Sequence, residues 1–112
     1  DDEKLPETVK KRIETETEVY VSVASFWEMA IKNSIGKMEL PASISVMMGA
    51  CEEMGFQLLP ITAQHLERIK ALPKIHGDPF DRLLICQAQE GNMEFITKDE
   101  NIPKYDVKTV WG

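Results

Sequence analysis

The sequence predicts an α/β domain with three layers, α/β/α, around a mainly parallel sheet. Short runs of β-branched and aromatic residues alternate with stretches in which apolar residues follow a helical period, and this alternation is typical of βα units. The length of 112 residues fits a single domain over residues 1–112. Hydrophobic residues make up 43% of the chain and charged residues 29%, a balance that excludes a disordered polymer.

The first half of the chain is expected to contain three helices and two strands. Leu5, Val9 and Ile13 recur every four residues and predict the first helix, whereas the following "EVYVSV" is rich in strand-forming residues. Gly36 and Gly55 each follow a helical pattern and are expected to end it. The predicted helices cover 5–17, 25–35 and 43–54, and the predicted strands cover 18–23 and 56–61.

The second half is expected to contain two more helices and two more strands. Thr62 is a suitable N-cap for the first helix, and Asp78 followed by Pro79 is typical of the start of the second. Gly91 is expected to end that second helix. The predicted helices run from Thr62 to Ile69 and from Pro79 to Glu90, and the predicted strands cover 93–97 and 107–111.

The predicted order of elements begins with a helix. An open parallel sheet usually begins with a central apolar strand, and no stretch before Val19 fits one. We therefore expect the sequence to lack the first central strand, through truncation, a misplaced start or proteolysis.

The chain is acidic, with a net charge of −6, and this disfavours a broad basic face that would grip nucleic acid. A locally basic groove or a metal-bridged phosphate remains open as a way to bind RNA. No apolar run has the roughly 18 to 20 residues that span a bilayer, and the polar N-terminus is unlike a signal peptide. Cys51 and Cys86 lack metal-like spacing and are expected to be buried free thiols. These features predict a cytoplasmic protein without membrane contact.

Three acidic residues, Glu28, Asp81 and Asp99, stand near the ends of predicted elements. Each has a local explanation when taken alone. Glu28 completes the capping-box pattern "SFWE", and Asp81 occupies the third position of the helix that Asp78 is expected to cap. Asp99 fits a turn or the N-cap of a short helical segment.

Their placement together predicts a common site. In an open parallel sheet, binding sites form outside the carboxyl ends of the strands, where the next helices begin. Glu28 and Asp99 each follow a predicted strand, and Asp81 begins the helix that leads into the strand before Asp99. All three carboxylates are therefore expected at one edge of the sheet. Crowded carboxylates repel one another unless a cation neutralises them, and oxygen ligands favour Mg²⁺ or Mn²⁺.

Four other polar residues were weighed as parts of a site. His65 is predicted to face solvent on a helix and His76 to lie in a loop, so neither is expected to be a ligand, and zinc is disfavoured. Lys32 and Arg82 lie close in sequence to the acids and are candidates for contacting a substrate phosphate. Solvation on a helix surface, or pairing with a neighbouring acid, is the simpler explanation for both.

Four separated segments resemble the PIN domain family, in the subgroup of VapC-type toxins of bacterial toxin–antitoxin pairs. They are "VYVSVASFWEMAIKNSIGKMELP", "GFQLLPITAQHL", "LPKIHGDPFDRLLICQAQ" and "FITKDENIPKYDVKTVW", and they cover nearly all of residues 18–111. Family members begin with a short strand that ends in an aspartate, the first metal ligand. This chain has no such stretch, and Asp1 and Asp2 follow no strand.

The resemblance implies a Mg²⁺- or Mn²⁺-dependent endoribonuclease. Glu28 matches the second acid of the family, Asp81 the third and Asp99 the fourth, as catalytic metal ligands, and Thr97 matches the hydroxyl residue beside the last acid. The resemblance also implies a toxin with an RNA substrate, a cognate antitoxin and a homodimeric assembly. Because the first acid is missing, we expect weaker metal binding and impaired cleavage in this form.

Two other classes of protein stay open. A catalytically inactive PIN-like interaction module is favoured if the gene truly lacks the first strand. A receiver domain also gathers Mg²⁺ at a sheet edge, but it needs adjacent acids after its first strand and a lysine after its last. The adjacent acids are absent and Lys108 precedes the last apolar pair, so a receiver domain ranks lowest.

Overall fold

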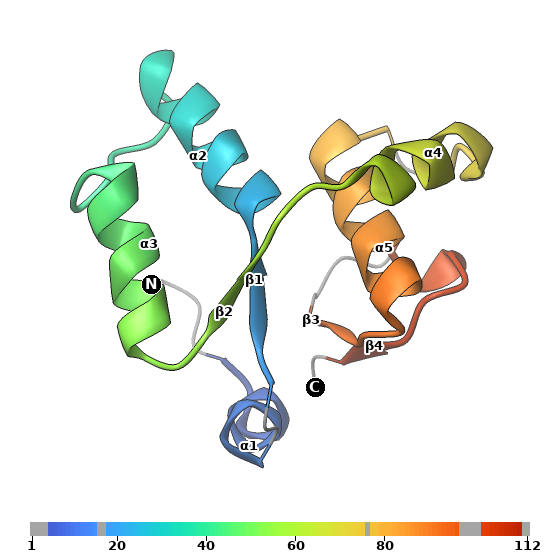
Figure 1. The fold of residues 1–112 in the computed structure, drawn as a ribbon, viewed down its shortest axis with the longest axis horizontal. Coiled ribbons are helices and arrows are strands. Elements are labelled where there is room, and N and C mark those ends of the chain that lie inside the picture. The colour runs from blue at the N-terminus through green and yellow to red at the C-terminus, as the bar shows by residue number, and fades with distance from the viewer. Residues whose placement is uncertain (1–4, 16–17, 76, 97–101, 111–112) are drawn as a thin grey trace. The chain divides into compact units, whose positions relative to one another are not determined.

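The structure, a computed structural model, describes residues 5–15, 18–75, 77–96 and 102–110 (Figure 1). The chain forms two compact units. The continuous unit comprises Glu18–Ile61, and the discontinuous unit comprises Asp1–Thr17 together with Thr62–Gly112. Each unit has its own helices and its own pair of parallel strands.

In the continuous unit, a strand runs directly into a helix. β1 (Tyr20–Ser22) is followed without a loop by α2 (Val23–Ser34), and α3 (Ile44–Glu53) leads into β2 (Gln57–Leu59). β1 and β2 pair in parallel along all three residues of each strand. Figure 1 shows β1 and β2 side by side.

Helix α2 begins earlier than the sequence predicts. The Ser22 hydroxyl accepts a hydrogen bond of 3.0 Å from the backbone N–H of Ala24, so Ser22 is both the last strand residue and the N-cap. The predicted start at Ser25 is therefore wrong. The predicted strand over 18–23 is shorter at its end because Val23 is already helical.

Glycines end α2 and α3, as predicted. Gly36 has φ +74° and Gly55 has φ +91°, and both lie in the left-handed region that a residue with a Cβ atom rarely adopts. In each case the N–H of the next residue donates back to a carbonyl of the last helical turn, at 2.8 Å after α2 and 3.0 Å after α3. These Schellman motifs satisfy carbonyls that would otherwise lack a partner.

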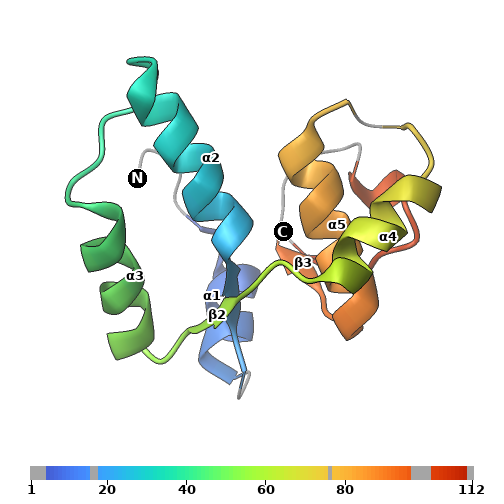
Figure 2. The same ribbon diagram turned by 45° about the horizontal axis from the view of Figure 1, so that its top comes forward.

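The discontinuous unit holds three α-helices, one 3₁₀-helix and two short strands within its described residues. Helices α4 and α5 pack against each other (Figure 2), and β3 pairs in parallel with β4. The elements are α1 (Glu7–Thr15), α4 (Ala63–Ala71), α5 (Pro79–Gly91), β3 (Phe95–Ile96), η1 (Ile102–Lys104) and β4 (Thr109–Val110).

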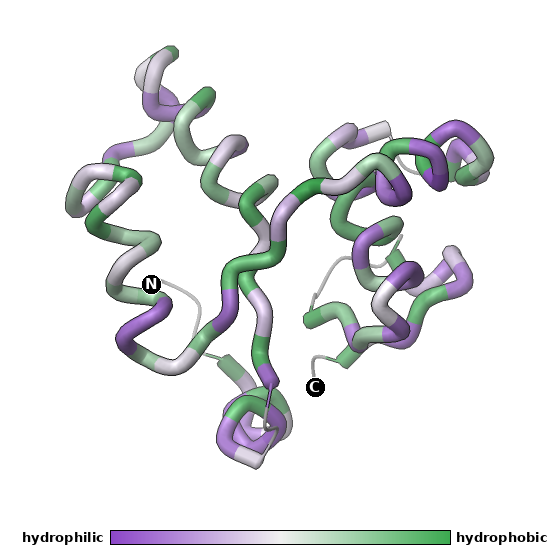
Figure 3. The backbone as a smooth tube through the Cα atoms, viewed as in Figure 1, coloured by the Kyte–Doolittle hydropathy of each residue, from purple (hydrophilic) through white to green (hydrophobic). Residues whose placement is uncertain are grey.

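Helix α5 forms the centre of this unit's core. Figure 3 shows hydrophilic and hydrophobic residues alternating along α4 and α5, as expected of helices with one buried face. Ile85 and Cys86 are completely buried, and Ile102 and Tyr105 pack against them from the chain that follows β3. Leu72, just after α4, completes the cluster. The predicted α-helical face of 79–90 is therefore confirmed as a core face.

The end of α5 differs from the prediction. Gly91 is still helical, and Asn92 adopts the left-handed conformation with φ 52° and ψ 47°. The N–H of Met93 donates to the carbonyl of Ala88 at 2.8 Å and closes the last turn. Asparagine serves here in place of glycine because its short polar side chain tolerates this conformation better than other side chains do.

The parallel strand pairing and the α/β class are confirmed. Among the described residues, hydrogen bonds join the strands only two by two, so the single continuous sheet of the prediction is not present in that part of the chain. β3 and β4 are shorter than predicted, and Thr97 and Trp111 lie outside the described residues. No helix within the described ranges is both long enough and apolar enough to cross a membrane.

The two cysteines test the packing of both units. Cys51 is half-buried on α3, whereas Cys86 is completely buried on α5, where burial raises the pKa of its thiol. We expect Ellman's reagent to modify Cys51 rapidly in the native protein and Cys86 only in denaturant. Cys51→Ser should abolish the rapid phase. Two rapid thiols in the native protein would contradict the packing of α5.

Candidate metal centre

Glu28 lies inside α2 and not at its cap. Because α2 begins at Val23, Glu28 is the sixth helical residue, and the predicted capping box with Ser25 is wrong. The Glu28 side chain is 25% exposed, and its Oε2 atom lies 3.0 Å from Nζ of Lys32, one turn further along the helix. Capping therefore does not explain this acid, which is instead half of an exposed ion pair.

The position of Glu28 on the helix explains its partial burial. It lies one turn after Ala24, which is completely buried, so the two residues share a face of α2. A rise of about 1.5 Å per residue places Glu28 about 7 to 8 Å along the axis from the first residue of the helix. It is thus in the second turn after β1 and not in the first turn, where the sequence predicted it.

Asp78 and Pro79 begin α5 as predicted. The Asp78 Oδ1 atom accepts hydrogen bonds from the backbone N–H groups of Phe80, at 2.9 Å, and Asp81, at 3.4 Å. Asp81 is the third helical residue, and it is half-buried. A carboxylate in the first turn is favoured by the positive end of the helix dipole, so the local explanation for Asp81 survives in the structure.

Arg82 does not lie on the surface as a solvated cation. Its Nη1 atom donates to the carbonyl of Pro73 at 2.9 Å, and its Nη2 atom donates to the carbonyl of Leu72 at 3.3 Å. The Tyr105 hydroxyl lies 3.5 Å from Nη1 and accepts a hydrogen bond of 3.0 Å from the N–H of Ile75. Tyr105 was not predictable from the sequence, because an aromatic residue between short polar stretches shows no periodicity.

The structure does not bring the predicted acids together within one described unit. Glu28 belongs to the continuous unit and Asp81 to the discontinuous unit. Asp99, Thr97 and His76 lie outside the described residues. Over the described part of the chain, no three histidine, cysteine, aspartate or glutamate side chains form a group that could hold a metal ion. The convergence of the three acids remains a prediction.

His65 is buried, and the predicted solvent-facing position is wrong. Its Nδ1 atom accepts a hydrogen bond of 3.0 Å from the N–H of Thr62, while the Thr62 hydroxyl accepts one of 3.4 Å from the N–H of His65. The histidine thus takes the place that glutamate or glutamine has in a capping box. Burial lowers the pKa of His65, although the Glu90 carboxylate opposes this effect, and the neutral ring keeps Nδ1 available as an acceptor.

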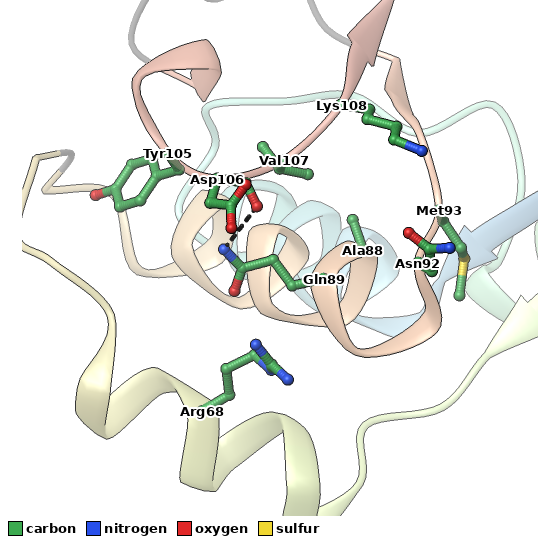
Figure 4. A pocket seen from close by; sticks show the side chains of 9 residues that line it. All are labelled: Arg68, Ala88, Gln89, Asn92, Met93, Tyr105, Asp106, Val107 and Lys108. Atoms are coloured by element: carbon green, nitrogen blue, oxygen red, sulfur yellow. Dashed lines mark hydrogen bonds between the residues drawn. The ribbon is translucent and has the colours of Figure 1, made fainter.

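A polar pocket of about 340 Å³ lies at the other end of α5 from Asp81 (Figure 4). The Gln89 side chain donates a hydrogen bond of 3.1 Å to the backbone carbonyl of Asp106 on its wall. The lining residues are Arg68, Ala88, Gln89, Asn92, Met93, Tyr105, Asp106, Val107 and Lys108.

The charges of this pocket are of both signs. Arg68 and Lys108 are opposed by Asp106, and Arg68 also donates from Nε to the Glu90 carboxylate at 2.8 Å. Eight residues of helix separate Asp81 from Gln89, which corresponds to about 12 Å along the axis. The pocket therefore lies away from Asp81, and its charged residues are of both signs.

The family model for the PIN domain matches residues 1–108. The chain belongs to the PIN domain family. The match begins before the segments whose resemblance was noted in the sequence, so it also includes α1. No curated protein matches this sequence.

PIN domains are generally nucleases that need divalent metal ions. Carboxylate side chains are the donors that such an ion prefers. Glu28 and Asp81 supply half-buried carboxylate oxygens, and each lies in the first two turns of a helix. Hard divalent cations prefer oxygen ligands of this kind, whereas the buried His65 and Cys86 already serve a helix cap and the core.

The capping box of His65 makes the stability of the discontinuous unit pH-dependent. The unfolded histidine titrates near pH 6.5, and the folded one binds its proton only at lower pH, so the free energy of unfolding should fall as the pH drops below about 6.5. The loss should level off once the pH is below the lowered pKa. His65→Gln keeps the acceptor at this position and does not titrate.

Urea unfolding of both proteins between about pH 7.5 and pH 5 checks this prediction. The difference in unfolding free energy between wild type and His65→Gln should shift toward the variant as the pH falls. A difference that is constant over this range would show that His65 does not titrate as its burial requires.

Proposed function

We propose that this PIN domain is a Mg²⁺- or Mn²⁺-dependent endoribonuclease that hydrolyses RNA phosphodiester bonds, and that it is the VapC-type toxin of a toxin–antitoxin pair acting in the cytoplasm. The observation that carries the proposal is the PIN domain match over residues 1–108. The carboxylates at the starts of α2 and α5 support it, because one of them is not explained as a helix cap.

The proposed metal ligands are Glu28, Asp81 and Asp99, with Thr97 as a supporting hydroxyl. Glu28 is the strongest of the three on physical grounds. A half-buried carboxylate that caps nothing, and that is balanced only by an exposed lysine, contributes little to folding. A role as a metal ligand gives this carboxylate a function that helix capping does not.

The proposed reaction depends on the charges of the side chains around the metal ion. Glu28, Asp81 and Asp99 would hold a divalent ion, which would polarise the phosphate and lower the pKa of a bound water. In this proposal the Glu28 carboxylate binds the cation, and the Lys32 ammonium, which lies 3.0 Å from that carboxylate, contacts the RNA backbone. Arg82 differs, since its guanidinium is already engaged by backbone carbonyls.

Protein partners are supported by an apolar stripe on α2. Trp27, Ile31 and Ile35 recur every four residues and are 52%, 39% and 60% exposed. Phe26, beside them, is 3% exposed and packs inside. We propose that the protein is a homodimer and that a cognate antitoxin regulates it. Contiguous exposed apolar surface is a feature of protein interaction sites.

The ligand proposal predicts a loss of metal-linked stability. In thermal melts, saturating Mg²⁺ or Mn²⁺ should stabilise the wild type, by about 2.7 kcal/mol at 100 times the dissociation constant. Glu28→Gln and Asp81→Asn should remove this gain and lower the rate of RNA cleavage by at least about 100-fold, since even residues that only support metal ligands cost 10- to 100-fold.

Two matched controls separate ligands from ordinary helix carboxylates. Glu67→Gln removes a carboxylate that pairs with Lys70 at 3.1 Å on α4, the same kind of pair as Glu28 with Lys32. Asp78→Asn keeps an efficient N-cap on the same helix as Asp81. Both controls should retain the metal response. If all four variants respond alike, or if the wild type shows no metal response, the catalytically inactive interaction module becomes the better reading.

The homodimer predicts a mass change when the stripe is made polar. Ile31→Lys should convert a dimer to a monomer in light scattering, because it places a charge in the centre of the apolar stripe. Leu66→Lys is the matched control, since Leu66 is 53% exposed on α4 in the other unit. Equal masses for the wild type and Ile31→Lys would remove the stripe from the dimer interface.

A further inference from the structure

Arg82 joins the first turn of α5 to the chain that precedes the helix. Its guanidinium donates to the carbonyls of Leu72 and Pro73, which lie ten and nine residues earlier. These carbonyls belong to the segment between α4 and α5, which has no strand or helix of its own. Two hydrogen bonds from one planar group fix both the distance and the orientation of that segment relative to the helix.

Tyr105 also connects α5 to the segment before it. Its side chain is 5% exposed and belongs to the same core cluster as Ile85 and Leu72. Its hydroxyl accepts the N–H of Ile75 at 3.0 Å and lies 3.5 Å from the Arg82 guanidinium. One buried hydroxyl therefore contacts both the segment before α5 and the residue after Asp81.

The first turn of a helix needs such support. Its N–H groups have no acceptors within the helix and rely on one capping residue: the Asp78 side chain accepts from Phe80 and Asp81, and the Asp78 carbonyl accepts from Arg82. Helix ends open more easily than helix centres. A carboxylate in this turn is also pushed away by any other carboxylate that approaches it before a cation binds. A ligand at this position is effective only if the turn is held in place.

We propose that Arg82 and Tyr105 are positioning residues that hold the first turn of α5 so that the Asp81 carboxylate is presented to the divalent cation. This inference rests on the proposed function, in which Asp81 is a metal ligand. It replaces the sequence-based expectation that Arg82 contacts a substrate phosphate. Supporting residues of this kind typically contribute 10- to 100-fold to metal affinity.

The two roles of Arg82 predict different behaviour for Arg82→Lys. A phosphate contact is largely a matter of charge, which lysine keeps. A fork that binds two carbonyls at once needs the planar guanidinium, which lysine lacks. The positioning role therefore predicts a loss of metal affinity in Arg82→Lys, whereas a phosphate contact predicts unchanged metal affinity and an altered salt dependence of RNA binding.

The test is Mn²⁺ binding to the full chain, measured by calorimetry without RNA. Tyr105→Phe removes a single oxygen atom and Arg82→Lys removes the fork, and each should raise the dissociation constant for Mn²⁺ by about tenfold or more. Both should still unfold cooperatively in a thermal melt. Ile85→Val is the control, because it loosens the same core without touching a hydrogen bond, and it should bind Mn²⁺ like the wild type.

The outcomes separate the two proposals. If the wild type and Asp81→Asn bind Mn²⁺ equally, the ligand role of Asp81 in the proposed function fails and the positioning role fails with it. If Asp81→Asn loses binding while Tyr105→Phe and Arg82→Lys bind like the wild type, only the positioning role is overturned. It is also overturned if Ile85→Val loses as much affinity as Tyr105→Phe, because general loosening of the core would then explain the loss.

Discussion

The burial of α5 is the constraint on which the discontinuous unit depends. Ile85 and Cys86 are completely buried, and Ile102 and Tyr105 pack against them in the same core cluster. Fixing this helix fixes both of its ends. One end carries Asp81 and Arg82, and the other carries the polar pocket and the turn into β3. The packing of α5 therefore positions both Asp81 and the polar pocket, which lie about 12 Å apart along the helix axis.

The sequence predicted the elements well where local chemistry decides the outcome. Gly36 and Gly55 end their helices because the left-handed conformation suits glycine, and Thr62 and Asp78 begin theirs because their side chains accept backbone N–H groups. The predicted start of α2 was wrong because two nearby residues are both suitable N-caps. Ser22 and Ser25 can each cap α2, and sequence alone does not show that the chain turns helical at Val23.

The candidate site was predictable only in part. The residue types and the α/β class led to the PIN family, which the family match confirms. Positions that depend on tertiary contacts were not accessible. His65 looked like a surface residue because a capping histidine has no distinctive pattern, and Arg82 looked like a free cation because its partners are carbonyls nine and ten residues away. Glu28 and Asp81 belong to different units, and no local sequence pattern indicates that division.

The absence of any connecting residue between β1 and α2 has a consequence for how this segment tolerates change. Each helical residue turns the chain by about 100°, so one inserted residue after Ser22 would rotate every later side chain of α2 by that angle relative to the strand. Ala24 and Glu28 would turn together away from their present side of the strand, and the buried Ala24 and Phe26 would leave the core. The spacing from strand to acid is thus set by the backbone itself, and substitutions are easier to accommodate here than any change in length.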